Sequence, residues 1–414
     1  MTASRDLDIV VYGATGFVGR ITAAYLAEHA PEGVRIALAG RSRTRLDRIR
    51  AELGPAAQAW PVLEADAGDP QSLAALAART RVVVTTVGPY AKYGLPLVQA
   101  CAESGTDYVD LTGEVLFHRE SIDRFDDLAR RTGARIVHSC GFDSIPSDLG
   151  VHALHRAVQA DDAGDLTDTT LVVRAMRGGV SGGTIDSMRT QVDVVRRDAA
   201  ARKVALAPYS LSPDRSREPD LGRQNDLATV DGRSVAPDLS GRLAPFFMGP
   251  YNTRVVRRSN ALSGWAYGPR FRYRETMSVG SSRLSPLVAT GVAAGFGALV
   301  AGLAFPPTRF VLDKLLPAPG QGPSESARER GFFTIDLYTT TSTGARYRAR
   351  VAAQGDPGYK ATAVMLGESA LSLVLGGDRL HAGGGVLTPA TAFGDVLTDR
   401  LRAAGFEITA RRLP

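Results

Sequence analysis

Short apolar runs alternate with stretches of helical periodicity over the first 140 residues. The apolar runs are continuous and rich in valine and isoleucine, as is typical of parallel strands whose two faces are both covered by helices. Strands are predicted over residues 9–12, 35–39, 59–63, 81–86, 107–110 and 135–138. Helices are predicted from Phe17 onward and over 43–53, 70–79, 95–104 and 121–132. Repeated units of this kind predict an α/β fold with a doubly wound parallel sheet.

The rest of the chain mixes the two periodicities. Strands are predicted near 171–177, 332–338 and 347–352, and helices near 151–158, 185–195, 361–375 and 390–404. We therefore expect three parts. Residues 1–140 form the doubly wound domain, and residues 141–380 form an α+β domain with a mixed sheet for substrate binding or dimerisation. Residues 381–414 form a helical segment that returns to the first domain.

Two segments of the second domain stand out by polarity. Residues 205–250 are polar and rich in proline, glycine and serine, which predicts a long loop or lid. A strand at 270–274 alternates perfectly, with Phe271 and Tyr273 opposite three arginines. The arginines of this region form one localised basic cluster: Arg254, Arg257, Arg258, Arg270, Arg272 and Arg274. The cluster is either a solvated surface or a docking site for an acidic carrier domain or a phosphate.

Residues 287–305 are 19 residues without a charge. The run is rich in glycine and alanine, and Gly291 and Gly295 have the spacing that allows close helix packing. Its length would permit a membrane span. Three interpretations remain open: a buried or dimer-interface helix of a homodimer, a helix lying on a membrane surface, or a true span.

Composition restricts the functional classes. With 414 residues, 44% hydrophobic and 22% charged, the chain is an ordinary globular protein rather than a disordered or fibrous one. The formal net charge of +6 is mostly scattered, so we expect no nucleic-acid binding. Cys101 and Cys140 cannot form a disulfide framework, and charges at Arg5, Asp6 and Asp8 interrupt any signal peptide. A cytoplasmic location follows, and no residue spacing indicates a metal site.

The strongest chemical motif lies at the first strand-to-helix turn. Its glycines permit a tight turn, close approach of a pyrophosphate, and close packing of helix on strand. The helix N-terminus there favours an anion. The predicted cofactor-binding residues of this turn are Gly13, Thr15, Gly16, Phe17, Val18 and Gly19. The alternative is a tight turn without a ligand, but its position after the first strand of a repeated α/β unit favours a Rossmann dinucleotide site.

The end of the second strand indicates which dinucleotide is bound. An NAD site carries an acidic residue there, but this chain has Arg41, Ser42 and Arg43. These side chains suit the 2′-phosphate of NADP(H), so we predict NADPH as cofactor. Arg43 is alternatively part of a solvated helix face. Asp66, after the third strand, either accepts from the adenine amino group or caps the next helix.

The fourth strand ends where the nicotinamide is expected. Gly88 and Pro89 would lie along the cofactor, or they merely end the strand. Hydride transfer to a substrate held beside the nicotinamide also requires side chains that stabilise an oxyanion or donate a proton. Tyr90 is the first candidate for this catalytic role, followed by Lys92 and Tyr93, and each is alternatively a wall residue.

Several separate motifs resemble the saccharopine dehydrogenase-like oxidoreductases. These are the glycine turn at 13–19, Gly-Arg-Ser at 40–42, Val-Gly-Pro-Tyr at 87–90, and the runs 108–114 and 140–150. The segments 181–184, 320–324 and 383–392 resemble the actinobacterial trans-acting enoyl reductase branch. The resemblance implies an NADP-binding Rossmann domain and a mixed α+β substrate domain. It also implies reduction of enoyl intermediates for polyketide synthases that lack their own reductase, in the synthesis of cell-envelope lipids.

Three functional hypotheses follow. The first is an NADPH-dependent enoyl reductase acting on a carrier-bound lipid or polyketide precursor, with a polyketide synthase as partner. The second is a carbon–nitrogen oxidoreductase of the saccharopine type, which the apolar run at 287–305 fits poorly. The third is a non-catalytic, nucleotide-binding protein of a lipid surface, located peripherally at the inner face of the plasma membrane.

Overall fold

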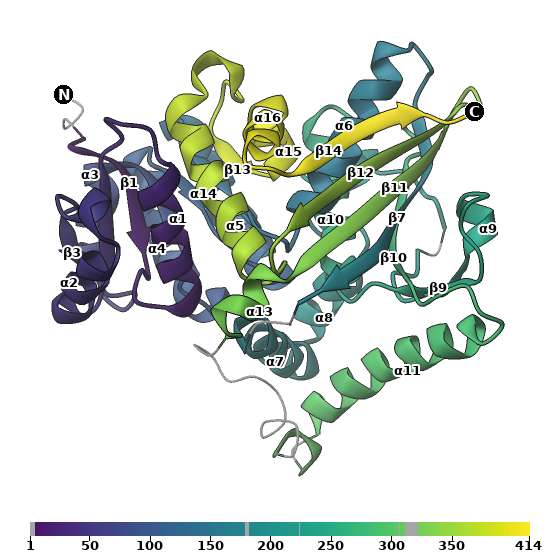
Figure 1. Cartoon of the computed structure of the whole chain (residues 1–414), viewed down its shortest axis with the longest axis horizontal. Helices are drawn as coiled ribbons and strands as arrows, with labels where there is room; N and C mark the ends of the chain where they lie inside the picture. The colour runs from purple at the N-terminus through teal and green to yellow at the C-terminus, as the bar shows by residue number, and fades with distance from the viewer. Residues whose placement is uncertain (1–4, 179–181, 223, 306, 311–321) are drawn as a thin grey trace.

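Two β-sheets organise the molecule, one toward each end of the view in Figure 1. The structure is a computed structural model and describes residues 5–178, 182–222, 224–305, 307–310 and 322–414. The N-terminal sheet carries the glycine turn, and the second sheet lies beside it, as expected for an α/β domain followed by an α+β domain.

The first sheet is parallel throughout, with the strand order β13-β6-β5-β4-β1-β2-β3. Its strands are β1 (Leu7–Tyr12), β2 (Ile36–Gly40), β3 (Val62–Glu64), β4 (Thr80–Thr85), β5 (Asp107–Val109), β6 (Arg135–Val137) and β13 (Gly385–Leu387). Every residue of β1 and β2 is buried, because helices cover both faces. The doubly wound prediction is confirmed.

The helices of this domain follow the predicted order. They are α1 (Phe17–His29), α2 (Arg43–Glu52), α3 (Pro70–Arg79), α4 (Tyr90–Ser104) and α5 (Val115–Thr132), with a short 3₁₀ turn η1 (Pro55–Ala57). Helices α4 and α5 begin earlier than their apolar periodicity predicted. The buried carboxylate of Glu114 accepts hydrogen bonds from the backbone N–H groups of Tyr90 and Ala91, so a long-range contact stabilises the first turn of α4.

The second sheet is mixed, with the order β14-β12-β11-β7-β10-β9-β8. Its strands are β7 (Leu166–Arg177), β8 (Val230–Asp231), β9 (Arg242–Pro245), β10 (Arg272–Ser278), β11 (Phe332–Thr341), β12 (Arg346–Gln354) and β14 (Glu407–Arg412). Strands β7 and β10 are parallel, and the other pairs are antiparallel. Helix α6 (Ile145–Ala160) packs on β11, β12 and β14. A Cβ on Gly150 would lie 2.7 Å from Leu337 Cδ1, so glycine permits this close packing.

The C-terminal segment differs from the helical segment predicted at 381–414. Strand β13 extends the first sheet beside β6, α15 (Pro389–Phe393) and α16 (Asp395–Ala403) follow, and β14 pairs with β12 in the second sheet. Helix α16 packs on α14 (Lys360–Leu375), and α14 lies on α1 and β4 of the first domain. The segment therefore joins both sheets. Strands as short as β13 and β14 give little periodicity, and their pairing depends on partners far away in the sequence.

Buried polar contacts attach α14 to its neighbours. Glu368 is 5% exposed and accepts hydrogen bonds from Tyr25 (2.5 Å) and Arg400 (2.6 Å). A plain polar stripe on α14 would leave such a carboxylate in solvent. Its ion pair with Arg400 instead links α16 to the first domain through α14.

Residues 205–250 are more structured than the predicted loop. They contain the end of α8 (Ala199–Leu206), η2 (Arg215–Arg217), β8, α9 (Gly232–Val235), β9 and the start of α10 (Gly249–Leu262). These elements are short, and their polar residues form local caps, such as the Asp231 carboxylate accepting from Arg233 N. Edge pairing with β10, rather than local periodicity, orders β9.

The predicted basic cluster divides into two groups. Arg272 and Arg274 are exposed opposite the buried Phe271 and Tyr273, as the alternation predicted. Arg254, Arg257 and Arg258 instead lie inside the protein on α10. Arg258 is fully buried and donates to the carbonyl oxygens of Leu211 and Val386, each at 2.6 Å. The prediction of a single basic surface is therefore wrong, because Arg254, Arg257 and Arg258 are buried and donate hydrogen bonds to backbone carbonyl oxygens.

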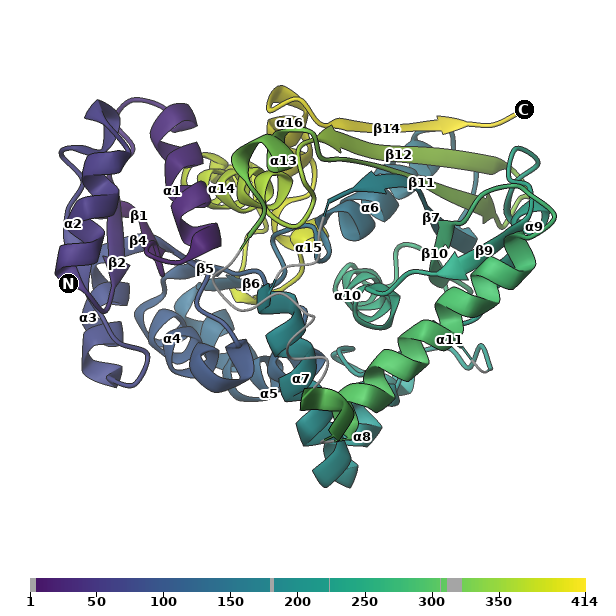
Figure 2. The same cartoon turned by 60° about the horizontal axis from the view of Figure 1, so that its bottom comes forward.

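The uncharged run forms α11 (Ser285–Ala304), which extends along the edge of the molecule in Figure 2. It contacts β9 and α7 (Gly182–Arg197), yet Leu287 is 73% exposed and Val300 is 48% exposed. The interpretation of this run as a helix buried within one chain is therefore wrong. By length and composition α11 is the one helix of the described residues that could cross a membrane. The dimer-interface, lipid-surface and membrane-span interpretations stay open.

Candidate active site

The glycine turn has the geometry that a dinucleotide site needs. Gly13 has φ +88°, and a Cβ there would lie 2.7 Å from Val87 Cγ2. A Cβ on Gly19 would lie 2.2 Å from the carbonyl oxygen of Gly13, so this position accepts only glycine without backbone movement. Gly16 is exposed and precedes α1 without a side-chain cap, which leaves the first N–H groups of α1 available to an anion. These residues fit a bound pyrophosphate.

Positively charged side chains lie beside this turn. Arg41 is exposed directly after β2, and it forms no ion pair with any residue that the structure describes. Ser42 caps α2, because its side chain accepts a hydrogen bond from the backbone N–H of Arg45. Arg43 Nε lies 4.0 Å from Asp47 Oδ2 within α2. Arg41 is thus the free cation of the predicted set. Asp66 accepts from Gly68 N, and Asp69 is the residue that caps α3, so the capping interpretation of Asp66 is wrong.

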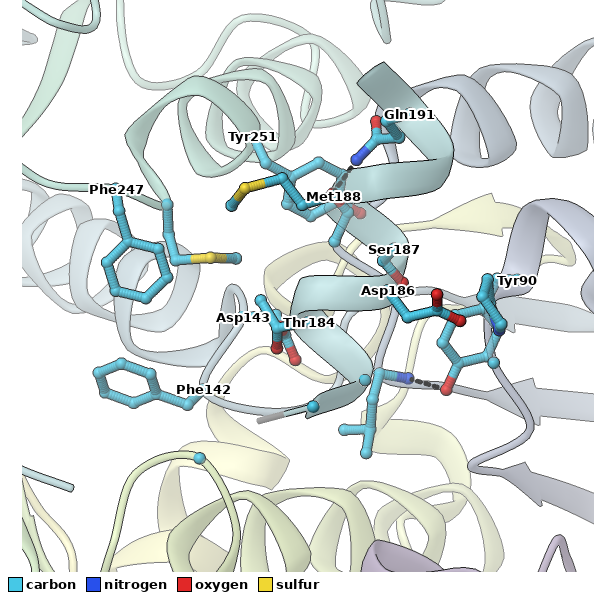
Figure 3. Close-up of a pocket in the computed structure, with 18 of the residues that line it drawn as sticks. Tyr90, Phe142, Asp143, Thr184, Asp186, Ser187, Met188, Gln191, Phe247 and Tyr251 are labelled. Atoms are coloured by element: carbon cyan, nitrogen blue, oxygen red, sulfur yellow. Dashed lines mark hydrogen bonds between the residues drawn. The ribbon is translucent and has the colours of Figure 1, made fainter. Parts of the chain in front are cut away.

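A cavity of about 760 Å³ begins at the glycine turn and passes between the two domains. Gly16, Phe17 and Val18 border one end, and Gly88 and Pro89 border the adjacent strand end. Helices α7, α10 and α11 supply largely apolar walls: Met188, Val192 and Val195 from α7, Pro250 and Tyr251 from α10, and Gly297, Val300, Ala301 and Ala304 from α11. Figure 3 shows Met188 and Tyr251 on two of these walls. A cavity of this size and character suits an apolar ligand with few polar groups.

The predicted catalytic residues occupy different places. Tyr90 lines the cavity, but its hydroxyl accepts from Leu111 N at 3.1 Å and donates to the Thr85 carbonyl at 3.2 Å. Lys92 and Tyr93 are exposed and do not line the cavity, because α4 turns their side chains outward. The structure brings Tyr90, Gly88 and Pro89 together and leaves Lys92 and Tyr93 apart.

Helix α7 lies over the cavity, and two polar side chains of α7 hold it there. Ser187 Oγ donates to Glu114 at 2.5 Å, and the Gln191 side chain bridges Gly113 O and Val115 N. Glu114 is fully buried and links this contact to the start of α4. The sequence has a glycine-rich run at 178–184 leading into α7, which predicts either N–H groups presented to an oxyanion or a flexible connection. This run falls partly on residues 179–181, which lie outside the described residues. The Tyr-Val-Asp-Leu-Thr-Gly-Glu run contained Glu114, but its sequence carried no sign of the α7 contact.

Sequence reasoning also missed Asp143, whose carboxyl group lines the cavity (Figure 3). Burial, reinforced by the charge of Asp110, raises the pKa of Asp143 to about 7. Asp143 follows β6, so it lies at the same carboxyl edge of the sheet as Gly88. A lone carboxylate after a short strand gives no local pattern by which sequence could single it out.

A second polar group lies behind the cavity and is sealed. His138 Nδ1 lies 2.7 Å from Asp110 Oδ2, and His138 Nε2 lies 2.8 Å from Ser121 Oγ. The sequence did not predict this Ser–His–Asp line. All three side chains are fully buried and do not line this cavity, so the line holds the ends of β5 and β6 against α5. Among the described residues, no three His, Cys, Asp or Glu side chains are grouped to hold a metal.

Comparisons with known proteins agree with this geometry. The family model "Saccharopine dehydrogenase NADP binding domain" matches residues 9–137. A Mycobacterium tuberculosis protein, provisionally named a trans-acting enoyl reductase, is 57% identical over 100% of both chains. The trans-acting enoyl reductase of Mycobacterium bovis is 51% identical over 99% of both chains.

The fold comparison extends over the whole chain. Apo saccharopine dehydrogenase (L-Glu forming) from Saccharomyces cerevisiae covers 99% of this chain and 100% of its own, with a TM-score of 0.52 and 14% identity. At that identity the match shows the shared fold alone. The first domain is an NADP-binding domain, in agreement with the predicted cofactor. The chain therefore belongs to the saccharopine dehydrogenase-like oxidoreductases, in the branch that includes the mycobacterial trans-acting enoyl reductases, and it is an NADP-dependent oxidoreductase.

Proposed function

We propose that this protein reduces the carbon–carbon double bond of an enoyl thioester on a long acyl chain attached to a carrier, with NADPH as reductant. The observation that carries this proposal is the apolar cavity that runs from the glycine turn to α11. The curated relatives at 51–57% identity that are named trans-acting enoyl reductases support the same reaction class.

The residues divide the work along the cavity. The glycine turn and the start of α1 bind the pyrophosphate, and Arg41 pairs with the 2′-phosphate. Bound NADPH supplies a hydride to the β-carbon of the enoyl group. Pro89 and Tyr90 form the wall beside the reacting carbons, and α7 excludes water from them. Val300 and Ala301 of α11 hold the acyl chain farther out.

The test is NADPH oxidation with long-chain enoyl thioesters, such as pantetheine or acyl-carrier derivatives. We expect turnover with NADPH, formation of the saturated thioester, and weaker activity on short-chain substrates. Turnover of an imine but not of an enoyl thioester would favour the carbon–nitrogen oxidoreductase. Nucleotide binding without any redox turnover would favour the non-catalytic lipid-surface protein.

We further propose that α11 places the protein on the cytoplasmic surface of a membrane, near a polyketide synthase that supplies the substrate. One side of α11 borders the cavity at Gly297 and Ala304, while Leu284 is 65% exposed and Leu287 is 73% exposed. An acyl chain can therefore pass from lipid to cavity along one helix.

Co-sedimentation with phospholipid vesicles tests this location. We expect Leu284→Ser combined with Leu287→Ser to reduce vesicle binding, whereas Leu375→Ser, at a 44% exposed leucine that ends α14, leaves it unchanged. The opposite result is a wild-type protein that does not bind vesicles but forms a dimer. If Leu284→Ser combined with Leu287→Ser disrupts that dimer, α11 belongs to a dimer interface.

A further inference from the structure

Asp143 is placed between two backbone loops at the cavity. Ideal Cβ positions on Gly141 and Gly113 would lie 3.2 Å from its Oδ2 and 3.8 Å from its Oδ1. A Cβ on Gly141 would also lie 2.6 Å from Leu111 Cδ2, so glycine leaves room for the carboxyl group. Phe142 and Thr362 border the same part of the cavity, and the close-up in Figure 3 shows the Asp143 oxygens toward the space below α7.

Tyrosine and serine side chains around this space are already engaged in hydrogen bonds. Tyr90 bonds to two backbone groups, and the Tyr251 hydroxyl lies 2.5 Å from Ser139 Oγ and 3.1 Å from His118 Nδ1. Ser187 donates to Glu114, whose carboxylate also accepts two backbone N–H groups. Among the described residues, the Asp143 carboxyl has no hydrogen bond to another residue. A substrate can therefore take its proton without breaking a contact to another of these residues.

On the basis of the proposed function, we propose that Asp143 is the catalytic acid that delivers the proton to the α-carbon of the enoyl thioester. Asp143 lies at the carboxyl edge of the first sheet, where Gly88 and Pro89 also border the cavity. A substrate lying between that edge and α7 therefore meets the reducing cofactor and this carboxyl group in one space.

The step balances with a hydride from the reducing cofactor and a proton from the Asp143 carboxyl group. A hydride adds to the β-carbon, the π bond between the α- and β-carbons breaks, and its electron pair moves onto the thioester oxygen as an enolate. The O–H bond of Asp143 then breaks, its proton forms the new bond at the α-carbon, and the enolate returns to a thioester. Asp143 is left as a carboxylate and regains a proton from water when product leaves.

The surroundings favour the protonated form of this carboxyl group up to about neutral pH. Desolvation, together with the negative charge of Asp110, raises the pKa of Asp143 to about 7. The titratable groups near this region are Asp110 after β5, Tyr90 at the start of α4, Glu114 at the start of α5, Asp186 and Arg196 on α7, Tyr251 on α10, and Tyr359 before α14. Arg196 is the one cation among the described residues that line the cavity, and its guanidinium donates to the carbonyl oxygen of Ala304. The charge that acts on Asp143 is that of Asp110, and it favours the acid form.

The experiment compares wild type with Asp143→Asn, using NADPH and a long-chain enoyl thioester. We expect kcat to fall by about 10²–10⁴-fold, the usual contribution of general acid catalysis, with unchanged NADPH binding measured by fluorescence titration. Wild-type kcat should decrease as the pH rises through about 7, because the carboxyl group must be protonated. The variant should lack that decrease. Asp143→Ala also removes the carboxyl group and leaves a larger cavity. It repeats the test if the asparagine variant does not fold.

Glu275→Gln is the matched control. Burial raises the pKa of Glu275 to about 7 as well, but this residue does not line the cavity. We expect it to keep wild-type kcat and the wild-type pH profile. Wild-type kcat in both Asp143 variants, or a retained decrease above pH 7 in them, overturns this inference alone. Failure of wild type to reduce any enoyl thioester overturns the proposed function, and this inference with it.

Discussion

Ser187 Oγ in α7 donates a 2.5 Å hydrogen bond to the buried carboxylate of Glu114. The same carboxylate accepts from Tyr90 N at 2.9 Å and Ala91 N at 2.8 Å. One side chain thus connects the helix that covers the cavity with the strand end where the nicotinamide site is expected. Closure of α7 and the position of Tyr90 are therefore coupled through Glu114.

Ser187→Ala tests this coupling. A hydrogen bond to a charged group contributes about 1.5–3 kcal/mol, so α7 should detach more readily. We expect hydrogen exchange of the α7 amides to quicken by about tenfold or more, and KM for the acyl substrate to rise. Thr190→Ala is the control on the same helix, because that hydroxyl bonds only to Asp186 O within the helix. Equal effects of the two variants would contradict the coupling.

Arg41→Ala tests cofactor selection. Losing a charge-assisted contact of about 1.5–3 kcal/mol should weaken NADPH binding by about 10–100-fold. NADH binding should stay unchanged, because NADH has no 2′-phosphate. Arg45→Ala, an exposed arginine of α2, should leave both affinities as they are. Fluorescence titration gives the dissociation constants of NADPH and NADH. An equal loss of affinity for both dinucleotides would count against this role of Arg41.

Gly19→Ala tests the fit of the glycine turn. The new Cβ would lie 2.2 Å from Gly13 O and 2.9 Å from Thr86 Oγ1, so the turn must move. Overpacking of this kind costs about 1–3 kcal/mol of folding stability, and the displaced N–H groups should no longer bind NADPH. Thermal unfolding and nucleotide titration measure the two effects. Gly291→Ala, where a Cβ meets open space, should be neutral or slightly stabilising. An unaltered NADPH affinity in Gly19→Ala would show that the turn does not hold the pyrophosphate.

Gly297→Leu tests the path of the acyl chain. Gly297 lines the cavity, and a Cβ there meets no atom within 4 Å, so a leucine side chain would occupy the space proposed for the chain. We expect kcat/KM for long-chain thioesters to fall by about tenfold or more, with short-chain turnover retained. Gly291→Leu adds the same bulk on the same helix away from the cavity. Chain-length profiles that coincide for the two variants would argue against this path.

Glu275→Gln also makes a prediction for stability. Burial raises the pKa of Glu275 from 4.5 to about 7, so the folded chain binds this proton more tightly than the unfolded chain. The contribution of Glu275 to the free energy of unfolding is full below pH 4.5 and is lost as the pH rises to about 7. Relative to wild type, the variant should gain up to about 3 kcal/mol over that range. Urea unfolding across pH measures it, with the exposed Glu28→Gln as control. A pH-independent difference would contradict the raised pKa.

Local periodicity was sufficient to predict six of the seven strands of the first sheet, all except β13. Every residue of β1 and β2 is buried, so each is a continuous apolar run, and each of the six strands is followed by a helix long enough to be recognised. The glycine turn was equally visible, because the positive φ of Gly13 and the contact of Gly19 with the Gly13 carbonyl oxygen are constraints set within the turn. The alternation at Phe271 and Tyr273 likewise gave the inner face of β10.

Tertiary structure alone decided which side chains meet at the cavity. Asp143 and Glu114 have no periodic context, and their roles depend on α7, which lies far along the sequence. Arg258 looked like part of a basic surface until the carbonyls of Leu211 and Val386 were placed around it. Local sequence determines strands, helices and tight turns through steric and hydrophobic preferences, whereas burial of a charge or closure of a cavity depends on contacts between distant segments, which exist only once the chain has folded.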